Sequence, residues 1–124
     1  MSKIALGTVQ FGTDYGINST YGKVQLDEVK RILNYAKSEG IELLDTAPAY
    51  GNSEQILGDC NVHKFNVVTK TRHFDCSIIS NREVDLLVSD FNISLKLLKQ
   101  KSIYGVLIHN ADDLLKSKSD KLYN

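Results

Sequence analysis

The chain has 124 residues, of which 42% are hydrophobic and 24% charged, a composition typical of one globular domain that spans residues 1–124. Fifteen basic and fifteen acidic side chains give a net charge of zero, which argues against nucleic acid or an anionic membrane as the main partner. We expect a cytoplasmic protein, because no apolar run is long enough for a signal peptide or a membrane span. Cys60 and Cys76 form no metal-binding or redox motif, so we expect reduced thiols and no metal site.

The first part of the chain is predicted to contain a strand, a loop and a helix. Residues 3–10 (KIALGTVQ) have the pattern of a strand, and residues 11–23 are predicted to be a loop whose length leans toward function. Apolar residues then recur at helical spacing over residues 26–36. Gly40 is expected to end that helix.

The stretch IELLDTAPAYG, residues 41–51, begins as an apolar run and ends in a turn. This pattern is typical of a buried parallel strand that runs into a loop. In α/β proteins the loops after the carboxyl ends of strands carry the chemistry, so Asp45 and Tyr50 are candidate functional residues. A short helix capped by Asn52 or Ser53 is expected to follow.

Two more strands and a long helix are predicted in the second part of the chain. Residues 65–70 (FNVVTK) and residues 103–109 (IYGVLIH) have the pattern of strands. Between them, residues 80–83 (SNRE) match the S-x-x-E capping box, and residues 84–98 carry the apolar stripe of an amphipathic helix. A further helix is expected to begin near Asn110.

Strand and helix therefore alternate four times, which predicts an α/β fold with a parallel sheet. A flavodoxin-like doubly wound sheet and part of a barrel fit this alternation equally well. No GxGxxG follows the first strand and no GxxxxGK[ST] occurs in the sequence, so the common phosphate-binding signatures are absent. The alternation alone leaves both architectures open.

Four segments, taken together and in this order, resemble the aldo-keto reductase family: GTVQFG at 7–12, GIELLDTAPAYGNSEQILG at 40–58, VVTK at 67–70 and LIHN at 107–110. The resemblance covers nearly the whole chain, and the DTAxxYG element is its most specific part. It implies a (β/α)8 TIM barrel of which only about the first four β/α units are present. It also implies an oxidoreductase that reduces a carbonyl with a nicotinamide cofactor, usually NADP.

The resemblance implies a catalytic set of one Asp, one Tyr, one Lys and one His, taken from successive strand ends. In this sequence the matching residues are Asp45, Tyr50, Lys70 and His109. Hydride transfer to a carbonyl carbon leaves charge on the oxygen, which must be stabilised and protonated. A tyrosine with its ordinary pKa near ~10 is a poor acid at neutral pH, and the Lys70 ammonium is expected to lower that pKa. Asp45 would hold Lys70 charged and aimed, and His109 would orient the carbonyl oxygen.

Each of these four residues also has an ordinary structural explanation when it is taken singly. Asp45 could cap a turn, Tyr50 could be a half-buried aromatic residue, and Lys70 could be a solvated strand end. His109 could be a turn residue. The case for catalysis is that all four fall at the ends of successive predicted strands. Three residues after the third strand are further candidates for lining the opening of the same site, namely Thr71, Arg72 and Asp75.

Chain length limits what the resemblance implies about the cofactor and the partners. A full barrel takes roughly 250 residues, so the family's segments that hold the cofactor phosphates are missing, and NADP (NADPH) is expected to bind weakly. Its nicotinamide end would lie near Gly7, Thr8 and Asp45. One hypothesis is a reductase of a small-molecule carbonyl that needs a completing second half-barrel. The alternative is a truncated, non-catalytic remnant or assembly module. Bare strand edges favour a homodimer or association with a second half-barrel.

Overall fold

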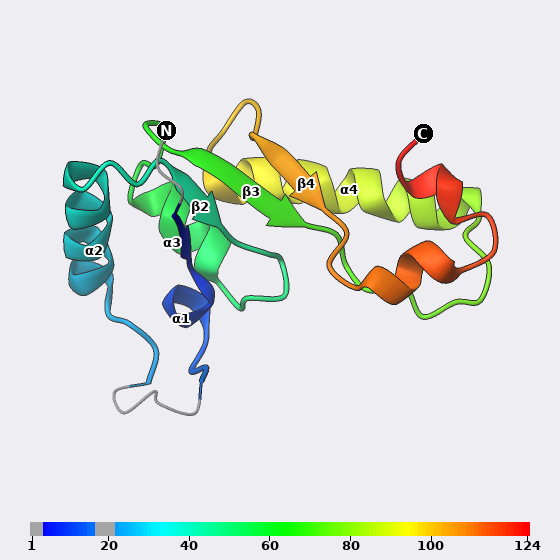
Figure 1. Cartoon of the computed structure of the whole chain (residues 1–124), viewed down its shortest axis with the longest axis horizontal. Coiled ribbons are helices and arrows are strands. Elements are labelled where there is room, and N and C mark those ends of the chain that lie inside the picture. The colour runs from blue at the N-terminus through cyan, green and yellow to red at the C-terminus, as the bar shows by residue number, and fades with distance from the viewer. Residues whose placement is uncertain (1–3, 17–21) are drawn as a thin grey trace.

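The computed structural model of the chain describes residues 4–16 and 22–124. Its centre is one parallel sheet of four strands in the order β1-β2-β3-β4 (Figure 1). The strands are β1 (Ala5–Gly7), β2 (Leu43–Asp45), β3 (Asn66–Lys70) and β4 (Gly105–Leu107). Because every strand pairs with the next strand along the chain, the sheet has the strand order of a (β/α)8 barrel. A flavodoxin-like sheet would place β1 between β2 and β3.

The register of the sheet brings polar residues to the carboxyl ends of neighbouring strands. Gly7 lies opposite Asp45, and Asp45 in turn lies opposite Val68. Lys70 lies opposite Leu107 at the end of the last ladder. Successive side chains of a strand point to opposite faces of a sheet, so Asp45 and Lys70 share the face opposite to that of the buried Leu44 and Val67.

Three helices make the crossovers between the strands: α2 (Leu26–Ser38), α3 (Ser53–Asp59) and α4 (Asn81–Leu98). In Figure 1, α3 and α4 lie behind the sheet, and the face of the sheet toward the viewer carries no long helix. The prediction of a helix over residues 26–36 is confirmed. Gly40 follows it with φ +74°, the left-handed conformation that favours glycine after a helix.

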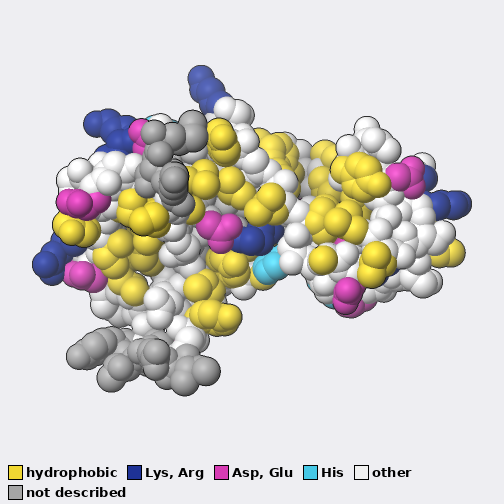
Figure 2. Space-filling model, viewed as in Figure 1, with side chains coloured by type: hydrophobic (Ala, Val, Ile, Leu, Met, Phe, Trp, Pro, Cys, Tyr) yellow, Lys and Arg dark blue, Asp and Glu magenta, His cyan; other side chains and the backbone are white. Residues whose placement is uncertain are grey.

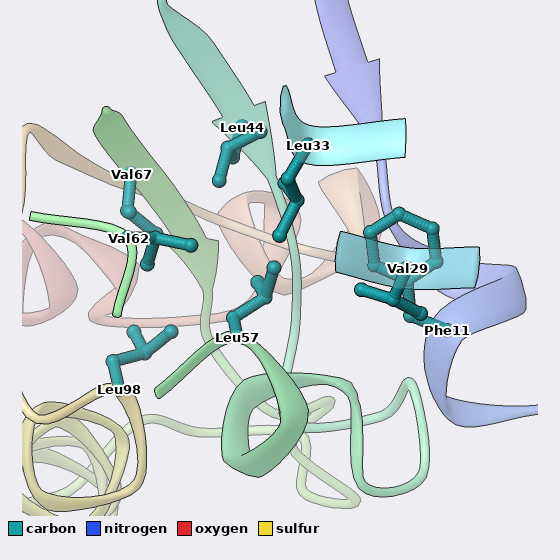
Figure 3. Close-up of a cluster of buried hydrophobic side chains, with 8 residues drawn as sticks. All are labelled: Phe11, Val29, Leu33, Leu44, Leu57, Val62, Val67 and Leu98. Carbon is teal, nitrogen blue, oxygen red and sulfur yellow. The ribbon is translucent and has the colours of Figure 1, made fainter. Parts of the chain in front are cut away.

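The hydrophobic core fills the space between the sheet and these helices (Figure 3). Leu44 and Val67 enter it from the sheet, and Leu57 and Leu98 enter it from α3 and α4. Burying one such side chain stabilises the fold by about 1.5–3 kcal/mol. The other members of the cluster are Phe11, Val29, Leu33 and Val62. This core cluster therefore packs against one face of the sheet.

Two predicted elements differ from those in the structure. Of the strand predicted over residues 3–10, the described part is extended only in β1, and Val9–Gly12 form the short helix α1. Residues 17–21 of the predicted loop lie outside the described residues. The helix expected near Asn110 is replaced by two 3-10 helices, η1 (Ala111–Leu115) and η2 (Ser119–Leu122).

The interruption after η1 follows from contacts with a segment that is distant in the sequence. Asp113 is fully buried and lies 3.4 Å from the backbone N–H of Phe74, so η1 is held against the segment after β3. Ile78 and Ser117 form an isolated parallel bridge, and Lys118 adopts a left-handed φ of +59°. A continuous α-helix cannot pass through either feature. Within the described residues, no helix is long and apolar enough to cross a membrane.

The capping box at the start of α4 is confirmed. The Ser80 hydroxyl accepts from the Arg82 N–H and donates to the Glu83 carboxylate, which also accepts from the Ser80 N–H at 2.9 Å. The hydrogen bonds from the Ser80 hydroxyl and backbone hold the pKa of Glu83 below its ordinary value.

We predict that this cap makes the stability of the chain depend on acid pH. Because the pKa of Glu83 is lowered by folding, its contribution is fully present above the ordinary glutamate pKa of about 4.3 and is lost as pH falls through the lowered pKa. Urea unfolding should therefore show Glu83→Gln less stable than the parent at pH 7, with a smaller difference at pH 3. An equal difference at both pH values would contradict the assignment.

Candidate active site

An ion pair joins the last residues of β2 and β3. The Lys70 ammonium donates to both carboxylate oxygens of Asp45, each at 2.7 Å, and to the carbonyl oxygen of Thr46 at 3.1 Å. The Lys70 side chain is only 13% exposed and that of Asp45 33%. An ammonium has three N–H donors, and here they have three acceptors. The position of the charge is therefore fixed from three directions.

Two rings lie beside this ion pair. The Lys70 Nζ is 4.8 Å from the centre of the Tyr50 ring, a cation–π distance. The Tyr50 and His109 rings meet edge to face, with their centres 5.9 Å apart and their planes at 86°. Residues that are separate in the sequence therefore form one cluster at the carboxyl edge of the sheet. The structure brings together all four side chains that the sequence singled out.

His109 is held by a residue that follows β3. The Thr71 hydroxyl accepts from the backbone N–H of His109 at 3.2 Å. Arg72 points elsewhere, because its guanidinium pairs with Asp90 on α4, and this carboxylate raises the pKa of Arg72. The Asp75 carboxylate is 3.3 Å from the His73 ring and its side chain is almost fully exposed. Of the three extra candidates, only Thr71 contacts the cluster.

The residues expected near the nicotinamide end of the cofactor differ in accessibility. Gly7 is exposed, and a Cβ built on it would have no atom within 4 Å, so its surface is open to a bound molecule. Thr8 has no exposed surface. Its N–H and its hydroxyl both donate to the carbonyl oxygen of Asp45, at 3.0 and 2.9 Å. Thr8 therefore supports Asp45 from within the protein and offers no surface to a cofactor.

A pocket of about 410 Å³ opens beside Tyr50 and His109, within the size range of small-molecule sites. The remaining lining residues come from α1, the segment after it and the turn before Tyr50: Val9, Thr13, Asp14, Tyr15 and Ala49. Sequence reasoning did not name these residues. The only signal was the long loop predicted over residues 11–23, whose described part supplies three of them.

Two glycines allow the Tyr50 turn to pack directly on α1. A Cβ on Gly12 would lie 1.7 Å from the carbonyl oxygen of Tyr50 and 2.5 Å from the Ser53 nitrogen. Gly51 has φ +58°, and a Cβ there would lie 2.4 Å from the carbonyl oxygen of Gly12. Real Cβ atoms do not approach so closely, so this contact requires both glycines. It places the Tyr50 turn against the first loop.

Comparison with known proteins agrees with this geometry. Residues 3–118 match the model of the aldo/keto reductase family, and the chain therefore belongs to this family. The solved structure of PA4992 from Pseudomonas aeruginosa, assigned as an aldo-keto reductase, is 32% identical with a TM-score of 0.72. The match covers 96% of this chain and 47% of that one. None of the curated proteins compared with the sequence matches it.

Two other solved structures extend the comparison. Another P. aeruginosa structure with the same assignment is 32% identical with a TM-score of 0.67, covering 97% of this chain and 44% of that one. A protein assigned as a 2,5-diketo-D-gluconic acid reductase B is 22% identical with a TM-score of 0.56, and the match covers 85% of this chain and 32% of that one. At this identity the likeness supports the fold alone. The chain thus spans less than half the length of these structures.

We predict that Gly12→Ala destabilises the chain because the new methyl group overlaps the Tyr50 turn. Overpacking of this kind costs about 1–3 kcal/mol, and urea unfolding would measure it. Gly7→Ala is the matched control, since a Cβ at Gly7 meets nothing within 4 Å. The control should stay within about 0.5 kcal/mol of the parent. Equal stability of the two variants would show that the glycine contact is not required.

Proposed function

We propose that this chain supplies the catalytic residues of an aldo-keto reductase that reduces a small-molecule carbonyl to an alcohol with NADPH. The observation that carries the proposal is the convergence of the four polar side chains at one edge of the sheet, beside a pocket of about 410 Å³. Family membership supports the oxidoreductase type. The reaction takes its hydride from NADPH when that cofactor is bound.

Each residue has a role that follows from its contacts. The Tyr50 hydroxyl donates a proton to the carbonyl oxygen as negative charge develops there. The Lys70 ammonium, held by Asp45, places positive charge against the Tyr50 ring. His109 lies edge-on to the same ring and orients the carbonyl oxygen by a hydrogen bond. Gly7 and Asp45 are the residues that would face the nicotinamide end of the cofactor.

The proposal includes completion by a second half-barrel. Each outer strand, β1 and β4, has only one neighbour in the sheet formed by the described residues. Large hydrophobic side chains on and beside these strands are exposed, namely Ile4, Tyr104, Val106 and Leu107. Figure 2 shows hydrophobic side chains around an acidic, a basic and a histidine side chain on this open face. A second copy or another half-barrel would cover them.

A non-catalytic remnant or assembly module is the second candidate function. It is favoured by the two outer strands, each of which has only one neighbour in the sheet formed by the described residues. The same uncovered sheet would then serve association without turnover. We propose a cytoplasmic location for the chain, where the thiols of Cys60 and Cys76 would stay reduced.

The assignment of Tyr50 as the proton donor predicts that removing its hydroxyl group strongly lowers the rate of carbonyl reduction. In an assembly containing this chain that reduces a carbonyl, Tyr50→Phe should lower the rate by on the order of 10²-fold or more. Tyr35→Phe is the control, because Tyr35 is exposed on α2, away from the site. Near-parent turnover by Tyr50→Phe, measured as NADPH oxidation, would remove Tyr50 from the mechanism.

The open sheet predicts self-association of the isolated chain. Sedimentation should show a dimer, and Leu107→Glu should weaken it, because Leu107 is 51% exposed on the outer strand β4. Leu115→Glu is the control, since Leu115 is 84% exposed on η1, outside the sheet. A parent chain that stays monomeric at high concentration would contradict the proposed surface.

The same chain should bind NADPH weakly, because only the nicotinamide end has residues to meet it here. Fluorescence titration of the isolated chain with NADPH should show no saturation at micromolar concentration. Saturable micromolar binding would show that the described residues hold more of the cofactor than the proposal assigns to them.

A further inference from the structure

We propose that Ser53 and Glu54, the first two residues of α3, are positioning residues that set the distance between the proton donor and the ion pair. This inference rests on the proposed function, because it concerns the geometry of the same site. Neither side chain contacts Lys70, the Tyr50 ring or the His109 ring in the hydrogen bonds, ion pairs and ring contacts of the described residues. They act through the residues next to those groups.

Ser53 joins the segments that follow β1 and β2. It is fully buried, and its hydroxyl oxygen lies 2.9 Å from both the carbonyl oxygen and the hydroxyl of Thr8. It also accepts from the Thr46 hydroxyl at 3.2 Å. Thr8 donates to the Asp45 carbonyl, and the Thr46 carbonyl accepts from Lys70. One hydroxyl therefore contacts both supports of the ion pair.

Glu54 joins β3 to α4. The residue is 3% exposed, and its carboxylate accepts from the Thr69 hydroxyl at 2.6 Å and from the Ser94 hydroxyl at 3.1 Å. The ion pairs found among the described residues include none with Glu54. Burying a carboxylate without a cation is unfavourable and is tolerated only when it is hydrogen-bonded. Thr69 precedes Lys70 in β3, so this carboxylate anchors the strand from the face opposite to Lys70.

The two adjacent residues thus connect the carboxyl ends of β1, β2 and β3 to one another and to α4. Ser53 also fixes the Tyr50 turn, because its N–H donates to the Tyr50 carbonyl at 3.0 Å. A change at this pair should move the Tyr50 ring relative to the Lys70 ammonium while the pocket lining stays in place, since neither residue lines the pocket beside Tyr50. The proposal therefore predicts an effect on proton donation with little effect on substrate binding.

The first test uses the chain itself and needs no turnover. In Ser53→Ala and Glu54→Gln, the nitrogen-15 signal of the Lys70 ammonium and the carbon-13 signals of the Tyr50 ring should shift from their parent positions. The controls are Ser89→Ala and Glu42→Gln, because both parent side chains are exposed, and they should leave these signals unchanged. Folded Ser53 and Glu54 variants with parent-like signals would overturn the proposal.

A milder pair of variants covers the case in which these changes unfold the chain. Thr69→Val removes the hydroxyl that donates to Glu54 while it keeps the shape of the side chain, and Thr69→Ser keeps the hydroxyl. Thr69→Val should shift the Lys70 signal from its parent position. Thr69→Ser, which keeps the hydroxyl, should leave the signal close to the parent position. Equal signals in the two variants would show that the hydrogen bond to Glu54 does not position Lys70.

The second test uses an assembly containing this chain that reduces a carbonyl. There Thr69→Val should lower kcat on the order of tenfold to 10²-fold, the scale of a small misplacement of reacting groups, with KM close to that of the parent. A raised KM with unchanged kcat would contradict positioning, because it would indicate weaker substrate binding instead. If the parent assembly reduces no carbonyl, the proposed function fails, and the spectroscopic result alone then decides the positioning role.

Discussion

The site depends on the ion pair between Lys70 and Asp45. Removing a charge from water is expensive, and a partly buried pair is favourable only when its remaining donors and acceptors are satisfied. Here the carboxylate supplies two acceptors and the Thr46 carbonyl supplies the third. This geometry requires β2 and β3 to be parallel, adjacent and in one register. The pairing of these two strands therefore determines where the ammonium lies.

The remaining parts of the site are arranged around this fixed charge. The Tyr50 ring lies against the ammonium, and His109 lies against the ring. Beneath them, the core packs against one face of the sheet, and buried hydroxyl and carboxylate groups hold the strand ends from that side. The other face is left with its polar cluster inside an apolar surface (Figure 2). The proposed catalytic cluster and the proposed association surface therefore lie on the same face of the sheet.

Local signals allowed much of this fold to be predicted. The spacing of apolar residues gave the helix α2, and the S-x-x-E pattern gave the cap of α4. Asp45 and Tyr50 were found because they end or follow a predicted strand, whereas Lys70 and His109 were found through the resemblance to the aldo-keto reductase family. The 3-10 helices were missed because their cause is a contact between Asp113 and Phe74, which are far apart in the sequence. Strand order was also not decided by the alternation of elements, since it is a property of pairing in space.

The supporting residues of the site could not be predicted for the same reason. Nothing in the sequence indicated that Thr8, expected near the nicotinamide end of the cofactor, is buried and donates to the Asp45 carbonyl. Nothing local in the sequence distinguishes the buried Glu54 from an exposed helix residue, because its partners Thr69 and Ser94 lie on other elements. Sequence patterns have too short a range to show either set of contacts.

The central claim, that Asp45 and Lys70 act as one unit, is tested most directly by a double-mutant cycle on unfolding free energy. The four proteins are the parent, Asp45→Asn, Lys70→Met and the double variant, compared by urea unfolding at pH 7. Groups in direct ionic contact show a coupling energy of about 0.5–3 kcal/mol, and we expect a value in this range. Additive losses from the two single changes would contradict the account, because the two charges would then contribute independently.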